Sequence, residues 1–376
     1  MPPSLPLIQP PASLCILRLS ALGDATHVLP VVNAIRDRWP QTRISWIIGT
    51  LERRLLRHFD GVEFIEFDKR GGWRAVGRLR EQLRARQFDA LLHMQVAARA
   101  NLLSRLVRTP LRLGWDQARS RDLHHWFTNH QVPAAPFQHQ VEGFLSFASA
   151  LGAPANEPRW GLGAGNEDRA WVDQHVDRQS RLLVISPCSS HALRNWRAER
   201  YAAVADHAVS ALGMQVVISG GPGELEARTA SEIEAAMRQS AINLVGKDTL
   251  TQSIALLDRA EVVISPDSGP AHIASALGTP VIGLHAATWS RRSGPYRSLD
   301  LCVDRFPEAA RKYRKREPEE LRWGTRIEVP GVMDLVEVDD VIERLERTAR
   351  GPALFARVGV CIRRFHEAGV HHADLN

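Results

Sequence analysis

The chain has 376 residues, of which 44% are hydrophobic and 24% charged, and its net charge at pH 7 is +6. This length predicts two domains, because one hydrophobic core rarely grows past about 250 to 300 residues, and the composition excludes an intrinsically disordered chain. The positive charge comes mainly from arginine, whose planar guanidinium suits phosphates and carboxylates, so we expect an anionic ligand or surface.

The cysteines and the N-terminal segment predict a cytoplasmic protein. The four cysteines are widely spaced, form no C-x-x-C pair and predict neither a zinc site nor a disulfide framework: Cys15, Cys188, Cys302 and Cys361. The first 14 residues lack a basic segment and contain five prolines, which argues against a signal peptide. The longest weakly charged stretch, residues 262–287, contains Asp267 and internal prolines, so we do not expect it to span a membrane.

The first part of the chain alternates strand-like and helix-like segments. An apolar run at residues 14–19 has the length and composition of a strand, and residues 20–26 turn the chain. Apolar residues then recur at helical spacing from Val28 to Trp39. Further strands are predicted at residues 44–48, 62–67 and 90–94, with a helix at residues 77–86. This alternation predicts a mostly parallel sheet with helices on both faces.

The same pattern restarts after residues 154–165, where Pro, Gly, Asn and Trp replace periodic sequence and predict a linker. The later strands are predicted at residues 182–185, 215–219, 262–265 and 281–284, and the helices at residues 198–212, 224–238, 251–259 and 271–277. We therefore expect an α/β fold in which two Rossmann-like, doubly wound domains face a cleft. They would comprise residues 1–160 and 161–350, followed by a tail of residues 351–376. Ligands bind such sheets beyond the carboxyl ends of the strands.

Asp24 lies in the turn after the first predicted strand, within the sequence S-A-L-G-D-A-T-H. A carboxylate at this position can act as a general base, but it can equally cap the helix that we expect to begin near Ala25. His27 lies three residues later on the same face of that helix, either as a second functional group or as a packed histidine.

Residues 264–272, I-S-P-D-S-G-P-A-H, predict an anion-binding helix start. A buried strand ends there in small residues, so the N–H groups of Ser268 and Gly269 can point at a diphosphate with the helix dipole behind them. Asp267 would repel a phosphate, and we expect it to cap the helix, hold the loop or contact a sugar hydroxyl.

Two further loops offer groups that suit a nucleotide. Residues 186–196 follow a strand with the hydroxyls of Ser189 and Ser190, and Arg194 supplies a positive charge for a leaving phosphate. Residues 219–224 open a helix with Glu224, whose carboxylate suits a ribose diol but is also ordinary at a helix start. The sequence has no P-loop, no strand-borne dinucleotide fingerprint, no H-E-x-x-H and no D-x-D, so it predicts neither ATP hydrolysis, nicotinamide chemistry nor a bound metal.

Four segments in this order resemble the ADP-heptose:lipopolysaccharide heptosyltransferases of glycosyltransferase family 9. They are L-S-A-L-G-D-A-T-H-V-L-P, P-C-S-S-x-x-x-R-N-W, G-G-P-x-E and D-S-G-P-A-H-I-A-S-A-L-G-T-P-V-I-G-L. The resemblance covers approximately residues 14–345 and implies the GT-B architecture of two Rossmann-like domains. Residues 88–95, 120–121 and 139–142 are more similar to the branch that adds the first heptose to Kdo.

The resemblance implies that Asp24 is the general base of a single inverting displacement. It implies a donor, ADP-heptose, that is held without a metal by Ser189, Ser190, Arg194, Glu224, Asp267, Ser268, Gly269 and His272. The acceptor would be an anionic glycolipid of the Kdo–lipid A type, on the cytoplasmic face of the inner membrane of a Gram-negative bacterium. For this acceptor we expect contacts from His27, Arg99, Arg119 and Arg121. The family often has lysine where Arg194 stands, which preserves the charge but changes the hydrogen-bond geometry.

Residues 351–376 lie outside this pattern and resemble the catalytic-loop region of lipopolysaccharide-core sugar kinases, with His372, Ala373 and Asp374 at the H-x-D position. No Gly-rich loop or strand lysine precedes them, so we expect a fusion remnant or an ordinary C-terminal helix rather than a working kinase.

Two other functions of the whole protein remain open. One is a GT-B transferase or epimerase that uses another nucleotide sugar. The other is a basic nucleic-acid-binding protein, which the lack of a helix-turn-helix or an aromatic-interleaved basic motif disfavours.

Overall fold

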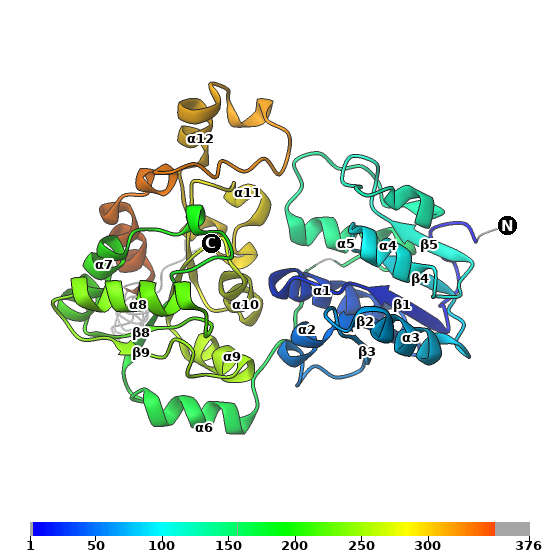
Figure 1. The fold of residues 1–376 in the computed structure, drawn as a ribbon, viewed down its shortest axis with the longest axis horizontal. Coiled ribbons are helices and arrows are strands. Elements are labelled where there is room, and N and C mark those ends of the chain that lie inside the picture. Colours follow the sequence, from blue (N-terminus) through cyan, green and yellow to red (C-terminus); the bar gives the residue numbers. More distant parts are fainter. Residues whose placement is uncertain (1–2, 156, 350–376) are drawn as a thin grey trace, which may run out of the picture.

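The computed structural model describes residues 3–155 and 157–349 and divides them between two parallel sheets (Figure 1). The first sheet has the strand order β3-β2-β1-β4-β5-β6. Its strands are β1 (Ser13–Leu17), β2 (Arg43–Gly49), β3 (Glu63–Phe67), β4 (Ala90–His93), β5 (Leu111–Gly114) and β6 (His130–Gln131). Every neighbouring pair is parallel, so the segments after β1, β3, β4 and β5 begin at the same edge of the sheet.

Helices cover both faces of this first sheet. Strand β1 is buried because its alternate side chains enter two different cores, Leu14 and Ile16 on one face and Cys15 and Leu17 on the other. The first face packs against α1 (Leu22–Arg38), α2 (Thr50–Leu55) and α5 (Gln140–Leu151), and the second against α3 (Gly72–Leu83) and α4 (Ala98–Ser104).

The second sheet repeats the arrangement with the order β12-β11-β10-β7-β8-β9, again all parallel. Its strands are β7 (Arg181–Ile185), β8 (Met214–Ile218), β9 (Ile242–Asn243), β10 (Val262–Pro266), β11 (Val281–His285) and β12 (Val303–Asp304). Its helices are α6 (Asn166–His175), α7 (Ala198–Leu212), α8 (Glu224–Ala236), α9 (Leu250–Arg259), α10 (Gly269–Leu277), α11 (Ser290–Ser293) and α12 (Phe306–Ala309). The predicted α/β fold with two parallel sheets is confirmed. The proposed boundary between residues 160 and 161 stays a prediction.

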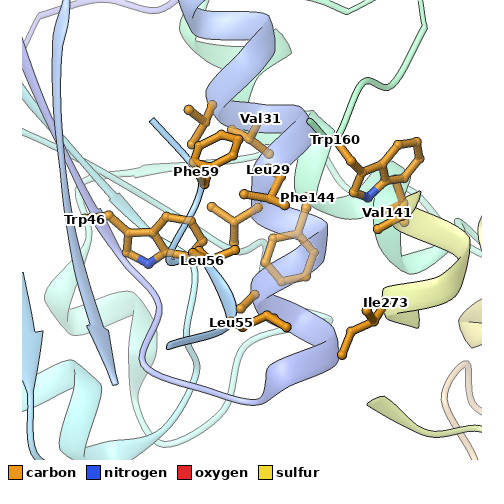
Figure 2. Close-up of a cluster of buried hydrophobic side chains, with 14 of the residues drawn as sticks. Leu29, Val31, Trp46, Leu55, Leu56, Phe59, Val141, Phe144, Trp160 and Ile273 are labelled. Atoms are coloured by element: carbon orange, nitrogen blue, oxygen red, sulfur yellow. The ribbon is translucent and has the colours of Figure 1, made fainter. Parts of the chain in front are cut away.

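The two halves of the chain touch along α1 and α10. A Cβ atom added to Gly23 would lie 2.7 Å from Cδ2 of His272, so the two helices meet where α1 carries no side chain. In Figure 2, Ile273 of α10 lies beside the α1 cluster, together with Trp160 from the connecting segment. The side chain of His139 also donates a hydrogen bond across the contact, from Nε2 to the carbonyl oxygen of Gly294 at 3.1 Å.

Among the described helices, none is both long enough and apolar enough to span a membrane.

Candidate active site

Asp24 lies at the contact between the two halves, in the first turn of α1. The helix begins at Leu22 with Ala21 as its N-cap, three residues before the start expected near Ala25, so Asp24 lies at its third position and not at its N-cap. Its Oδ2 atom nevertheless accepts a hydrogen bond from the backbone N–H of Ala21 at 3.2 Å, as the third helical residue of a capping box does. The carboxylate is 21% exposed, so capping leaves it partly accessible.

Two long side chains hold the Asp24 carboxylate, and sequence reasoning singled out neither for this role. Arg18 donates to Oδ2 from Nη2, and Gln140 donates to Oδ1 from Nε2 at 2.5 Å. Arg18 is itself held, because its Nη1 donates to the carbonyl oxygen of Met94 at 2.6 Å and its guanidinium lies 5.1 Å from the ring centre of Phe144. The orientation of the carboxylate is therefore fixed by contacts from β1, α5 and the loop after β4.

His27 is packed between the halves rather than presented to a ligand. His27 is 3% exposed, and its Nδ1 lies 3.9 Å from Oδ1 of Asp24. Its ring contacts the ring of His272 edge-on, with 4.8 Å between the ring centres. Burial, followed by the charges of His272 and His139, lowers the pKa of His27 well below its usual value, so the ring is neutral. The acceptor-binding role expected for His27 has no support in this geometry.

The segment between β10 and α10 lies on the second-domain side of the contact with α1. Ser268 is the N-cap of α10 and accepts from the N–H of Ala271, so Asp267 does not cap the helix as one expectation allowed. Pro270 lacks an N–H, so among the first residues of α10 it is Gly269 that has an N–H group available for an anion. The sequence predicted an anion site with more N–H donors.

Asp267 holds this loop through hydrogen bonds. Its Oδ2 accepts from the hydroxyl of Ser293 at 3.1 Å, and its Oδ1 lies 3.5 Å from Nε2 of His272. Burial alone would raise the pKa of the Asp267 carboxyl, but the hydrogen bond and charge of His272 outweigh it and hold the pKa well below the usual range. Asp267 is therefore an anion with a 12% exposed side chain, and its bonds join α10 to α11, which fits the expectation that it holds the loop.

The loop after β7 keeps its polar groups in internal bonds. The N–H of Ser189 donates to Oδ1 of Asn195 at 2.7 Å, and its hydroxyl donates to the carbonyl oxygen of His191 at 3.0 Å. Arg194 donates from Nε and Nη2 to Oε1 of Glu328, at 2.8 and 2.6 Å, and its side chain is 10% exposed. The positive charge predicted for a leaving phosphate is thus balanced by Glu328, a partner that lies 134 residues away in the sequence.

Ser190 and Glu224, by contrast, are exposed. Glu224 is the first residue of α8, and Ser190 lies in the loop after β7, the strand that pairs with the strand leading into α8. Both are free to meet a ligand at the carboxyl edge of the second sheet, as the sequence predicted for a nucleotide.

The three predicted acceptor arginines follow β4 and β5, at the same sheet edge as Asp24. Arg99 is exposed on α4 and donates to the carbonyl oxygen of Lys69 at 2.8 Å. Arg119 is bound to Asp116 and, at 3.0 Å, to the side chain of Gln138, whereas Arg121 is exposed. All three thus follow the carboxyl ends of strands in the first sheet, and their role in binding an acceptor stays a prediction.

Residues 3–155 and 157–349 contain no group of three or more His, Cys, Asp or Glu side chains arranged to hold a metal. Metal independence stays a prediction. The kinase-like segment, residues 351–376, lies outside the described residues, and the matches reported below include no kinase.

Comparison with known proteins gives two informative relatives. The chain is 39% identical over 339 residues to the "Lipopolysaccharide core heptosyltransferase OpsX" of Haemophilus influenzae, covering 90% of this chain and 97% of that protein. It is 23% identical to "Lipopolysaccharide heptosyltransferase 1" of Pseudomonas aeruginosa, covering 75% of this chain and 80% of that protein. These names establish a lipopolysaccharide heptosyltransferase family without singling out the branch that adds the first heptose, so that narrower resemblance stays a prediction.

Solved structures give the same architecture. A family 9 glycosyltransferase from Veillonella parvula superposes with a TM-score of 0.74 at 20% identity, covering 90% of this chain and 97% of that one. "E. coli heptosyltransferase WaaC with ADP" superposes with a TM-score of 0.69 at 18% identity, covering 89% and 99%. At such identities the likeness shows the GT-B fold alone. The family description "Glycosyltransferase family 9 (heptosyltransferase)" matches residues 76–323, and together with the identity to OpsX it shows that the chain belongs to this family of glycosyltransferases.

Proposed function

We propose that the protein is an inverting heptosyltransferase that moves a heptose from ADP-heptose to the inner core of lipopolysaccharide, onto Kdo or the first heptose. Family membership and the printed names of the relatives support the reaction class and the donor. The observation that carries the mechanism is Asp24, an accessible carboxylate that two side chains hold opposite the start of α10.

In this reaction the acceptor hydroxyl gives its proton to Asp24 while its oxygen attacks the anomeric carbon of the donor. The bond from that carbon to the diphosphate breaks on the opposite face, and the leaving ADP takes the electron pair. An alcohol is a poor nucleophile while it keeps its proton, so a positioned carboxylate contributes about 10² to 10⁴-fold to the rate. Arg18 and Gln140 serve this step by keeping the carboxylate in one orientation.

The leaving diphosphate meets the second domain. Ser190, the N–H of Gly269 and the guanidinium of Arg194 stabilise the developing charge, while Glu224 binds the ribose. Arg194 must exchange its bond to Glu328 for one to phosphate, since the two acceptors compete for the same N–H groups. Asp267 and His272 hold the loop that carries Gly269, and Ser189 shapes the loop after β7.

The acceptor meets the first domain at Arg99, Arg119 and Arg121, and we place this surface against the cytoplasmic face of the inner membrane. Trp73, Leu102 and Trp126 are 88%, 65% and 64% exposed. Two of them lie close to basic groups, because Arg99 shares the outer face of α4 with Leu102, and Arg105 donates to the carbonyl oxygen of Trp126 at 2.9 Å. Tryptophan beside arginine suits the interface of an anionic bilayer.

The proposal is tested by incubating the protein with a core-truncated lipopolysaccharide and ADP-heptose and measuring the mass transferred to the lipid. We expect a gain of one heptose. Calorimetry with ADP, UDP and GDP checks the donor separately, and we expect preference for ADP. Tight preference for a uridine nucleotide, with no heptose transferred, would overturn the ADP-heptose assignment.

A further inference from the structure

Arg292 is a cation at the contact between the domains that the mechanism above does not use. It lies on α11, one residue before Ser293, which donates to Asp267. Its side chain is partly buried and makes no hydrogen bond or ion pair with any residue in the described part of the chain. It lines a small cavity together with Thr288, Trp289, Ser293, Trp323, Gly324 and Arg326.

The segment that packs against Arg292 is built around it. Gly324 has φ +87°, and a Cβ atom there would lie 3.0 Å from Nε of Arg292. The backbone therefore approaches the guanidinium more closely than another residue would allow. Trp323, the preceding residue, donates from Nε1 to the carbonyl oxygen of Gln138 at 3.0 Å, and this bond ties the segment to the first domain. The segment that packs against Arg292 is thus bonded to the first domain and lies against the second.

The charges around Arg292 do not neutralise it. Burial lowers the pKa of its guanidinium, the carboxylates of Asp267 and Asp24 raise it, and the cations of Arg326 and Arg121 lower it. Both carboxylates already have donors of their own: Arg18 and Gln140 for Asp24, and Ser293 for Asp267. Charges of both domains thus act on Arg292, and neither of these carboxylates bonds to its side chain.

A partly desolvated cation without a bonded partner costs free energy until an anion reaches it. Without Arg292, the carboxylates of Asp24 and Asp267 would repel a phosphate or a carboxylate that binds near them. A cation near these two carboxylates offsets that repulsion, and an arginine offers several N–H donors in a planar fork.

We infer that Arg292, together with Arg326, which lines the same cavity, forms a subsite for an anionic oxygen group, a phosphate or a carboxylate, of a ligand bound at the domain contact. This inference rests on the proposed function for its choice of ligands: both a nucleotide diphosphate sugar and a Kdo-bearing acceptor carry such a group. The subsite lets an anionic ligand lie beside the general base without displacing Arg18 from it.

The test compares Arg292→Met and Arg292→Lys with a matched control, Arg291→Met. Arg291 is the neighbouring arginine on the same helix, but its side chain is 60% exposed and lies 3.7 Å from Glu319. Binding of ADP, inorganic pyrophosphate and free Kdo is measured by titration, and KM is measured for donor and acceptor. We expect Arg292→Met to weaken one ligand by about tenfold to a hundredfold, Arg292→Lys to recover part of the loss, and Arg291→Met to change nothing.

The set of ligands whose binding is weakened shows whether the anionic group belongs to the donor or to the acceptor. Weaker binding of both ADP and pyrophosphate assigns the subsite to the donor diphosphate. A raised acceptor KM and weaker Kdo binding, with ADP binding unchanged, assign it to the acceptor. If the wild-type protein transfers no heptose, the proposed function fails, but the pyrophosphate and Kdo titrations still decide the subsite.

Thermal unfolding separates ligand binding from a structural role. Because Arg292→Met removes an unpaired charge, we expect the ligand-free variant to keep or raise its Tm, while the Tm increase caused by the bound ligand shrinks. Unchanged ligand binding and KM in a folded Arg292→Met protein would overturn the inference, as would a loss confined to stability.

Discussion

Gly23→Ala tests whether the approach of α1 to α10 sets the geometry of the active site. The added Cβ would lie 2.7 Å from Cδ2 of His272, so the ring or the whole of α10 must move. Overpacking of this kind costs about 1 to 3 kcal/mol. Alanine recovers about 1 kcal/mol because it is a better helix former than glycine. The net loss of stability is therefore at most about 2 kcal/mol, or a fall in Tm of up to about 8 °C.

The effect on transfer should be much larger than the effect on stability. His272 lies 3.5 Å from Asp267, so its displacement disturbs the loop that carries Gly269, and a misplacement of about 1 Å can cost about 10²-fold in rate. Steady-state kinetics and thermal unfolding are measured on the same preparation. The control is Gly77→Ala on α3, where an added Cβ meets nothing within 4 Å and only stability should rise. Wild-type turnover by Gly23→Ala would refute this account of the domain contact.

Three further outcomes follow from the same structure. Glu328→Gln should strengthen ADP binding by about tenfold in calorimetry, because a neutral acceptor holds Arg194 less strongly than the carboxylate does, whereas Arg194→Ala should weaken binding. Equal affinities in the wild-type protein and both variants would exclude Arg194 from the donor site. Burial lowers the pKa of His139 from 6.5 to about 4, so the native state excludes a proton that the unfolded chain binds. The contribution of His139 to the free energy of unfolding should therefore be fully present above pH 6.5 and fall by roughly 3 kcal/mol as the pH drops to about 4. Urea titrations should show a weaker pH dependence for His139→Gln, and the same pH dependence in both proteins would reject His139 as its cause. Finally, Trp73→Ser should reduce binding to anionic vesicles in sedimentation while leaving the Tm unchanged, and undiminished binding would move the membrane contact elsewhere.

The fold and the loops that carry the site were predictable because their signals are local. Apolar runs of strand length alternate with helical spacing in both halves, and parallel sheets bring the ends of their strands to one edge. Asp24, Ser190, Gly269 and Glu224 each follow a predicted strand or open a predicted helix, so their place at the carboxyl edge of one sheet or the other could be inferred from the sequence. The identity of the N-cap in α10 could not, because Asp267 and Ser268 are equally good capping residues and tertiary bonds decide between them.

The partners of these residues were not predictable, because they lie far away in the sequence. Gln140 reaches Asp24 across 116 residues, and Glu328 reaches Arg194 across 134. Nothing local distinguishes these side chains from ordinary helix or loop residues. Arg292 could not be singled out for the same reason. In the sequence it stands beside Arg291 and resembles an ordinary exposed arginine, and only the close approach of Gly324 to Arg292 distinguishes the two.

The most direct test of the central claim is the rate of heptose transfer by Asp24→Asn. The substitution preserves size, and the amide of Gln140 can rotate to offer an acceptor to the new side chain, so the fold should survive. We predict that transfer falls by about 10² to 10⁴-fold, while the affinity for ADP and the Tm stay at their wild-type values. Wild-type turnover by Asp24→Asn would contradict the general-base role and leave Asp24 with its bond to Ala21 as a helix-capping residue.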